Sequence, residues 1–166
     1  MLQTAVDLKL DDVVTPAKSL FDDWMQRNRS IAPNIRDVVY SAGVKFGGPD
    51  EWKHCWETYN KTIYPSEKRI MLQALGSTTD PWLLQRYLLQ TLDRNQVRPQ
   101  DVETVIAAVA KNSEGKFLAW RHLKAHWSHI QGIFGNGSMT MGNLINVVTS
   151  DFFTEYDYHE VNVNEK

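Results

Sequence analysis

The stretch Asp80-Pro81-Trp82-Leu83-Leu84-Gln85-Arg86-Tyr87-Leu88 contains a complete set of signals for an amphipathic helix. An aspartate accepts hydrogen bonds from the free N–H groups of a first helical turn, and a proline fits the first helical position because its fixed φ is already helical. The apolar side chains that follow recur at spacings of three and four, at Leu83, Leu84, Tyr87, Leu88 and Leu92. This spacing predicts a helix with one buried face.

Similar signals lie on both sides of this stretch. Ser66 is a candidate cap for a helix that begins at Pro65. Residues 113–134 are expected to form one long helix that ends at a glycine-rich turn. The helix expected after Pro49 would bury Trp52, Cys55, Trp56 and Tyr59. Further helices are expected after Pro16, after Pro33, after Arg98 and over 139–148.

Alternate helices begin alike, and this similarity predicts a repeat. Asp50-Glu51-Trp52, Asp80-Pro81-Trp82 and Lys116-Phe117-Leu118-Ala119-Trp120 stand at intervals of about 30 to 38 residues. A helix pair repeating at this length is typical of an all-α, HEAT- or armadillo-like superhelical stack of antiparallel pairs. An irregular helical bundle is the alternative. We expect residues 1–166 to form a single helical domain, and a piece of a larger one, because neither end shows the polar capping helix that stacks require.

The charge balance and the hydropathy exclude two classes of partner. Eighteen basic and twenty acidic side chains give a formal net charge of −2, which leaves no basic surface for gripping a phosphate backbone. We therefore expect no nucleic acid partner. No stretch approaches the roughly 20 consecutive apolar residues of a membrane helix, so no membrane insertion by this segment is expected.

The residues that could carry chemistry form no catalytic or metal motif. His159-Glu160 begins like the HExxH zinc motif but lacks its second histidine. His122, His126 and His129 have helical spacing, but they flank an apolar stripe where a solvated edge is expected, and no acidic residue lies nearby to complete a metal site. Cys55 falls on an aromatic face and is expected to be buried. No catalytic residue, metal site or cofactor is expected in this chain.

Three Asn-X-Ser/Thr sequons are candidate glycosylation sites. They begin at Asn28, Asn60 and Asn136, each at or just past the end of an expected helix. A surface position of this kind would accept a glycan in the secretory pathway. Their shared placement favours an extracellular or lumenal location.

Several collinear segments resemble one protein family. The chain from about Lys18 to Tyr156 is similar to the C-terminal helical domain of the gluzincin zinc aminopeptidases, the family of aminopeptidase N and glutamyl aminopeptidase. The segments that carry the resemblance are Gly47–Trp52, Ser66–Arg69, Gln73–Gly76, Asp80–Leu88, Val97–Val102, Phe117–Trp120, Ser138–Val148 and Phe153–Tyr156.

The resemblance implies that catalysis and the covering of the cavity belong to different domains. In that family the zinc site and the residues that recognise a peptide N-terminus lie in a separate upstream domain, and the helical domain covers the cavity. It implies that this chain is not an enzyme by itself, that zinc belongs to the parent's catalytic domain, and that its partners are that domain and peptide substrates. A homodimer is left open. The parent would remove N-terminal residues from peptides, in the secretory lumen or outside the cell, with its membrane anchor at its N-terminus.

The resemblance also points to two cavity-facing residues. Met139 and Asn143 occupy the places where relatives present an apolar or aromatic residue and, four positions on, a polar or basic one. Residues i and i+4 share a helix face, so an amide that binds peptide could stand beside an apolar wall. The alternative is that Asn143 caps or bridges neighbouring helices.

Two other functions fit the same helices. One is a stand-alone HEAT-like protein-interaction module, and the other is a domain of an aminopeptidase homologue that has lost its metal motif. We also expect an exposed apolar surface that promotes self-association of the isolated chain.

Overall fold

The computed structural model describes residues 11–135, 139–150, 152–155, 157 and 159, and its regular structure is helical throughout these residues. The prediction of an all-α chain is thereby confirmed. The α-helices are α2 (Asp11–Arg27), α3 (Arg36–Phe46), α4 (Pro49–Lys61), α5 (Pro65–Leu75), α6 (Pro81–Gln90), α7 (Val102–Ala110), α8 (Lys116–Ala125), α9 (Trp127–Phe134) and α10 (Met139–Thr149). Two 3-10 turns, η1 (Pro33–Ile35) and η2 (Pro99–Asp101), precede α3 and α7.

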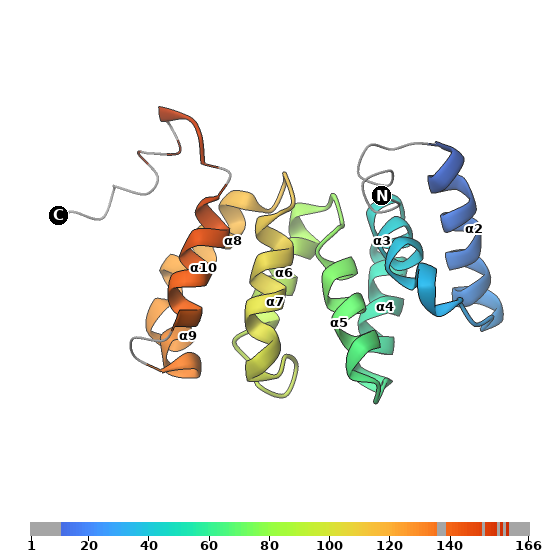
Figure 1. Ribbon diagram of the computed structural model, residues 1–166, viewed down its shortest axis with the longest axis horizontal. Coiled ribbons are helices and arrows are strands. Elements are labelled where there is room, and N and C mark those ends of the chain that lie inside the picture. Colours follow the sequence, from blue (N-terminus) through green and yellow to red (C-terminus); the bar gives the residue numbers. More distant parts are fainter. Residues whose placement is uncertain (1–10, 136–138, 151, 156, 158, 160–166) are drawn as a thin grey trace.

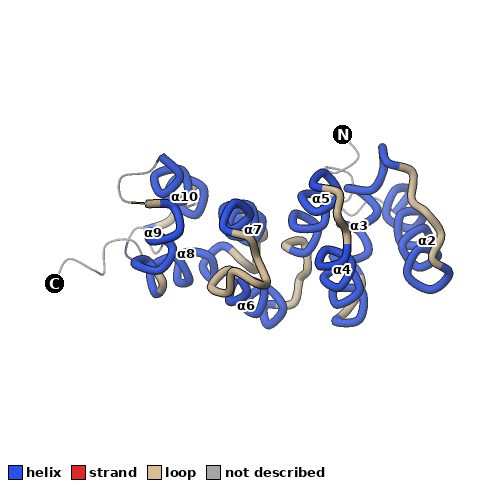
Figure 2. Tube along the Cα trace, turned by 90° about the horizontal axis from the view of Figure 1, so that it is seen from below, coloured by secondary structure: helices blue, strands red, loops and turns tan. Residues whose placement is uncertain are grey.

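The helices stack as antiparallel pairs along one direction (Figure 1). Helices α3, α5, α7 and α10 pack side by side in one layer, and α2, α4, α6 and α8 form the second layer (Figure 2). Each helix of the second layer packs against its partner of the first, as α2 does on α3 and α4 on α5. The predicted stack of antiparallel pairs is therefore present. Every helix that the structure describes is too short or too polar to span a lipid bilayer.

Aromatic side chains join neighbouring pairs in the core. The ring centroids of Trp52 and Trp56 in α4 each lie 5.9 Å from the ring centroid of Tyr87 in α6, in edge-to-face contact. Two of these three rings have a hydrogen-bonded polar atom: the Trp52 indole N–H donates to the Leu75 carbonyl at 3.1 Å, and the Tyr87 hydroxyl donates to the Leu72 carbonyl at 2.8 Å. Rings with a satisfied polar atom fill large volumes without an uncompensated polar group.

Two glycines allow close helix packing. A Cβ on Gly43 of α3 would lie 2.1 Å from the ring of Phe21, which is fully buried in α2. A Cβ on Gly76, at the end of α5, would lie 2.7 Å from the Cβ of Ala108 in α7. Such distances are well below van der Waals contact, so larger residues at these positions would push the helices apart.

Three helix boundaries differ from the sequence expectations. Helix α2 passes through Pro16 and is described from Asp11. Ser66 is not a cap, because Pro65 occupies the first helical position and holds the preceding Tyr64 in an extended conformation as the N-cap residue. The expected single helix over 113–134 is two helices, α8 and α9, because His126 leaves helical geometry at φ −116° and ψ 23°.

The repeat alignment is wrong at one position. Trp52 is the fourth residue of α4 and is buried, whereas Trp82 is the second residue of α6 and is exposed. Both helices begin with a proline, so the fourth residue of α6 is Leu84, which is fully buried. A shift of two residues rotates a side chain by about 200° around a helix, which places the two tryptophans on opposite sides.

Candidate functional site

Helix α10 holds the two residues predicted to face a cavity. Met141, Leu144 and Val148 are buried and fix the helix to the stack. Met139 and Asn143 lie one turn apart and are both exposed, with 85% of the Met139 surface accessible. The space beside Gly142, which lies between them in the sequence, is open: a Cβ there would meet nothing within 4 Å. The two side chains therefore share an accessible face of α10.

The Asn143 amide has no partner among the described residues. No hydrogen bond joins it to another described side chain or to the backbone, as a capping or bridging amide would require. Both its N–H₂ group and its carbonyl oxygen are free to bind a polar ligand such as a peptide. The exposed Met139 beside it offers a flexible apolar contact.

The three histidines do not converge on a metal site. His122 is buried, contrary to the expected solvated edge, because its Nε2 lies 3.0 Å from the Thr91 hydroxyl oxygen in the α6–α8 contact. His126 is half-buried at the α8–α9 junction, and His129 is exposed. No group of histidine, cysteine, aspartate and glutamate among the described residues is arranged to hold a metal ion.

His122 is a neutral structural residue. The Thr91 hydroxyl donates its proton to the Leu88 carbonyl at 2.6 Å, so the hydroxyl oxygen accepts the proton of His122 Nε2. Burial, followed by repulsion from His126 and His129, lowers the pKa of His122 to about 4. Protonation at this position would bury a charge without a carboxylate partner.

Cys55 is fully buried, as predicted. Burial raises the pKa of its thiol well above the ordinary value. A thiol that stays protonated and has no access to solvent is a packing residue and not a nucleophile.

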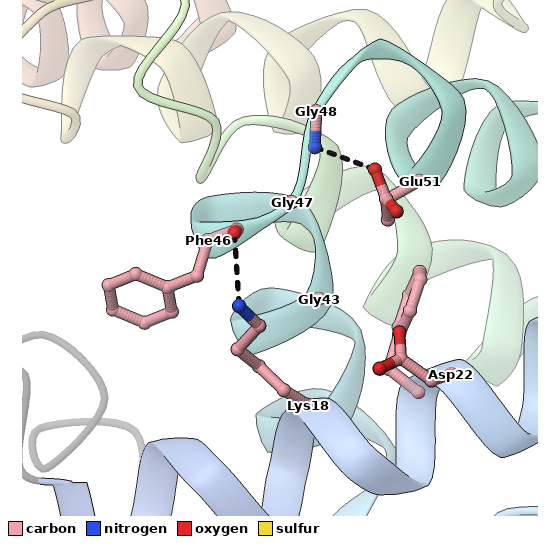
Figure 3. Close-up of a pocket in the computed structure, with 8 residues that line it drawn as sticks. Lys18, Asp22, Gly43, Phe46, Gly47, Gly48 and Glu51 are labelled. Carbon is pink, nitrogen blue, oxygen red and sulfur yellow. Dashed lines mark hydrogen bonds between the residues drawn. The ribbon is translucent and has the colours of Figure 1, made fainter.

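A hollow of about 240 Å³ lies where α2 meets the α3–α4 turn (Figure 3). Two of its charged side chains are used within the fold. The Lys18 ammonium donates to the Phe46 carbonyl at 3.4 Å, and the Glu51 carboxylate accepts the Gly48 N–H at 2.6 Å. Because these contacts close the α3–α4 turn, the hollow has a structural role.

Two of the three sequons are accessible. Asn28 follows α2 in the left-handed region at φ 53°, a conformation that asparagine tolerates. Asn60 lies in the last turn of α4, and both side chains are exposed. Asn136 lies outside the described residues. Accessibility is required for glycan attachment, so Asn28 and Asn60 satisfy this condition.

A second exposed surface lies on α6 and was not among the sites predicted from the sequence. Trp82 is 82% exposed, Leu89 is 48% exposed, and Gln85 and Arg86 between them are also exposed. These four residues, called the α6 face below, follow the spacing i, i+3, i+4 and i+7, which places them on one side of the helix. The spacing is readable from the sequence, but the repeat alignment had matched Trp82 to the buried Trp52.

Large apolar side chains are also exposed near the C-terminal end of the stack. Trp127, Met139, Ile145 and Phe153 are each at least one-third accessible. Whether this surface causes the isolated chain to self-associate stays a prediction.

Comparison with known proteins places the chain among aminopeptidase sequences. Residues 1–163 match the ERAP1-like C-terminal domain family. The chain is 33% identical to Aminopeptidase Ey of Gallus gallus and 31% identical to Aminopeptidase N of Homo sapiens, each over 162 residues, which is 96% of this chain and 17% of the relative. It is 36% identical over 146 residues, 87% of this chain and 14% of the relative, to the thyrotropin-releasing hormone-degrading ectoenzyme of Rattus norvegicus. The chain thus spans about one sixth of the length of these relatives.

Proposed function

Since this chain belongs to the ERAP1-like C-terminal domain family, we propose that it is the non-catalytic helical part of a longer zinc aminopeptidase that removes N-terminal residues from peptides. In this proposal the stack covers the active-site cavity, excludes water and controls which peptides enter. Closing a site in this way strengthens the electrostatic interactions inside it.

One observation carries the proposal. The similarity covers 96% of this chain and only 17% of Aminopeptidase Ey and Aminopeptidase N, whose names describe peptidases. The matched segment is small and belongs to a C-terminal domain family. In such a protein the catalytic groups would therefore lie in the larger, remaining part.

Zinc does not fit the part of this chain that the structure describes. His122 is committed to Thr91 and has a depressed pKa, and no group among the described residues has the ligand number that zinc requires. We therefore assign the metal to the parent's catalytic domain and derive no catalytic step from this segment.

Met139 and Asn143 are the proposed contacts with peptide. The free amide of Asn143 would donate to a peptide carbonyl or accept from a peptide N–H, and Met139 would pack against an apolar side chain of the substrate. Their exposure on one face of α10 supports this role.

An extracellular or lumenal location is part of the proposal. One relative is named an ectoenzyme, and Asn28 and Asn60 are exposed sequon positions. Glycosidase treatment of the protein from a secretory host tests this directly, because a shift in mass at these asparagines is expected only if the chain enters that pathway.

The experiment for the main proposal uses the complete reading frame. We expect the longer polypeptide to contain zinc and to hydrolyse aminoacyl amides, and the 166-residue chain alone to do neither. In the longer polypeptide, Asn143→Ala should raise KM for a peptide of several residues by about 3- to 10-fold, the effect of losing one to two hydrogen bonds. A single-residue amide, too short to reach α10, should be hydrolysed as before.

Three results would count against the proposal. A longer polypeptide without zinc and without peptidase activity would favour a metal-lacking homologue. A reading frame of only this length would favour a stand-alone interaction module. Equal effects of Asn143→Ala on long and short substrates would remove the assigned role of α10.

A further inference from the structure

We propose that the α6 face is the surface on which this domain docks against the preceding part of its own longer polypeptide. This inference rests on the proposed function, because it takes the chain to be one part of a larger protein. It names the residues that hold the two parts together, which neither the fold nor the family similarity identifies.

The α6 face is presented by a well-anchored helix. On the opposite side of α6, Leu83, Leu84, Tyr87 and Leu88 are buried in the stack. At the start of the helix the Asp80 carboxylate accepts the Trp82 backbone N–H at 2.8 Å, which fixes the backbone of Trp82. A side chain held on a rigid element loses little additional freedom when it binds.

The chemistry of the α6 face is typical of a binding surface. Tryptophan and arginine are the residues most enriched among those that dominate interface energies. Trp82 is 82% exposed, and no hydrogen bond joins its indole N–H to another described residue. Arg86 lies over the Trp52 ring at 5.9 Å, and no ion pair between described residues includes it. A partner surface would therefore offer an apolar recess with an acceptor for the indole and a carboxylate for the guanidinium.

Helix α4, the neighbour of α6 in the same layer, has a typical solvated face. The exposed residues of α4 include Lys53, Glu57 and Lys61, and the Glu57 carboxylate lies 3.9 Å and 3.8 Å from the two ammonium groups. In these i, i+4 ion pairs the opposite charges already have partners, and the side chains stay exposed to water at little cost in free energy. This difference separates the more apolar α6 face from the charged face of α4, its neighbour in the same layer.

The available area favours the same polypeptide over a second copy of the chain. Four side chains of one helix offer on the order of a few hundred Å², since even a tryptophan supplies only about 250 Å². A stable dimer of separate chains usually requires about 800 Å² from each partner. Two parts joined by a peptide linkage need less area, because the linkage supplies a high effective concentration. The relatives are about six times as long as this chain, so such a part exists in them.

Site-specific photo-crosslinking in the longer polypeptide tests the proposal. Position 82 would carry p-benzoylphenylalanine in one variant, and position 57 on α4 would carry it in the matched control. We expect position 82 to crosslink within one polypeptide to a peptide that precedes this domain, at least five-fold more than position 57. Equal yields at the two positions would overturn the proposal. Crosslinks between two copies would assign the face to a homodimer and would overturn it as well.

A truncation of the tryptophan gives an independent readout. In the 166-residue chain, Trp82→Ala should leave the urea midpoint unchanged, because the ring is exposed, and this control shows that the variant folds. In the longer polypeptide the same change should raise the rate of proteolytic cleavage at the junction by about 10-fold, while Glu57→Ala should leave it unchanged. No change with Trp82→Ala would contradict docking through this face.

The outcome separates this inference from the proposed function. A longer polypeptide with aminopeptidase activity but no crosslink from position 82 would refute only the docking surface. A crosslink without any peptidase activity would support the docking surface and refute the enzymatic proposal.

Discussion

Helices α4 and α6 lie in the same layer of the stack and both begin with a proline, yet they expose different surfaces. Helix α4 buries Trp52, 1% exposed, and turns a set of ion pairs to solvent. Helix α6 buries leucines and Tyr87 and turns Trp82, 82% exposed, to solvent. A shift of two positions along the helix accounts for the reversal. Whether a tryptophan near the start of a helix is buried can therefore be predicted only when its position, counted from the first helical residue, is known.

Truncation of the two tryptophans should have the largest and most unequal effects on stability. Trp52→Ala should cost about 3–5 kcal/mol of unfolding free energy, because it leaves a cavity and removes the donor to the Leu75 carbonyl. Trp82→Ala should change the unfolding free energy by less than about 0.5 kcal/mol. Urea unfolding of the two variants measures both values. Similar losses would show that Trp82 is part of the core.

A second test concerns how α6 is held at its C-terminal end, where Thr91 contacts His122 of α8. The folded-state pKa of His122, about 4, is below the unfolded value near 6.5. The unfolded chain therefore binds a proton first as the pH falls. Stability that is complete above pH 6.5 should decline by about 3 kcal/mol on the way to pH 4. Measuring unfolding free energy against pH provides the curve.

The matched control for this curve is His122→Gln, which keeps a hydrogen-bonding side chain without the titration. Its stability should vary less between pH 6.5 and 4 than that of the original chain. Asp157 affects a separate range, because the N–H groups of Thr154 and Phe153 hold its pKa at about 2. A decline that persists unchanged in His122→Gln would show that another group controls acid stability.

Removal of the helix cap should have a smaller effect. Asp80→Ala deletes the acceptor of the Trp82 N–H and should cost about 1 kcal/mol. Asp80→Asn should recover most of the loss, since asparagine caps helices nearly as well. Thermal unfolding of the pair is the measurement. Equal losses in the two variants would point to the charge of Asp80, and not to its hydrogen bond, as the stabilising feature.

The smallest effect is expected on the solvated face of α4. Lys53→Ala and Lys61→Ala each break one long ion pair with Glu57 and should change stability by less than about 0.5 kcal/mol. Raising the salt concentration should reduce even this difference, since the groups are exposed. A loss above 1 kcal/mol that resists salt would mean that the α4 face contributes more than solubility.

The candidate sites were predictable to different degrees. Met139 and Asn143 fall on one exposed face of α10, as their spacing required, although their contact with substrate stays a prediction. The α6 face was missed because the repeat alignment compared residue letters and not helix positions. The buried state of His122 was missed because it depends on Thr91, a residue 31 positions away. No local pattern reports such a contact.

The local amino-acid sequence sets where most helices begin and which residues they bury, because caps, prolines and apolar spacing act within one or two turns of the chain. It determined the start of α6 at Asp80-Pro81 and the aromatic face of α4 in this way. In contrast, the separation of α8 from α9 at His126 and the exposure of Trp82 follow from long-range packing. Both features depend on how neighbouring helix pairs pack against each other. Such packing brings together residues that are far apart in the sequence, so no local pattern predicts it.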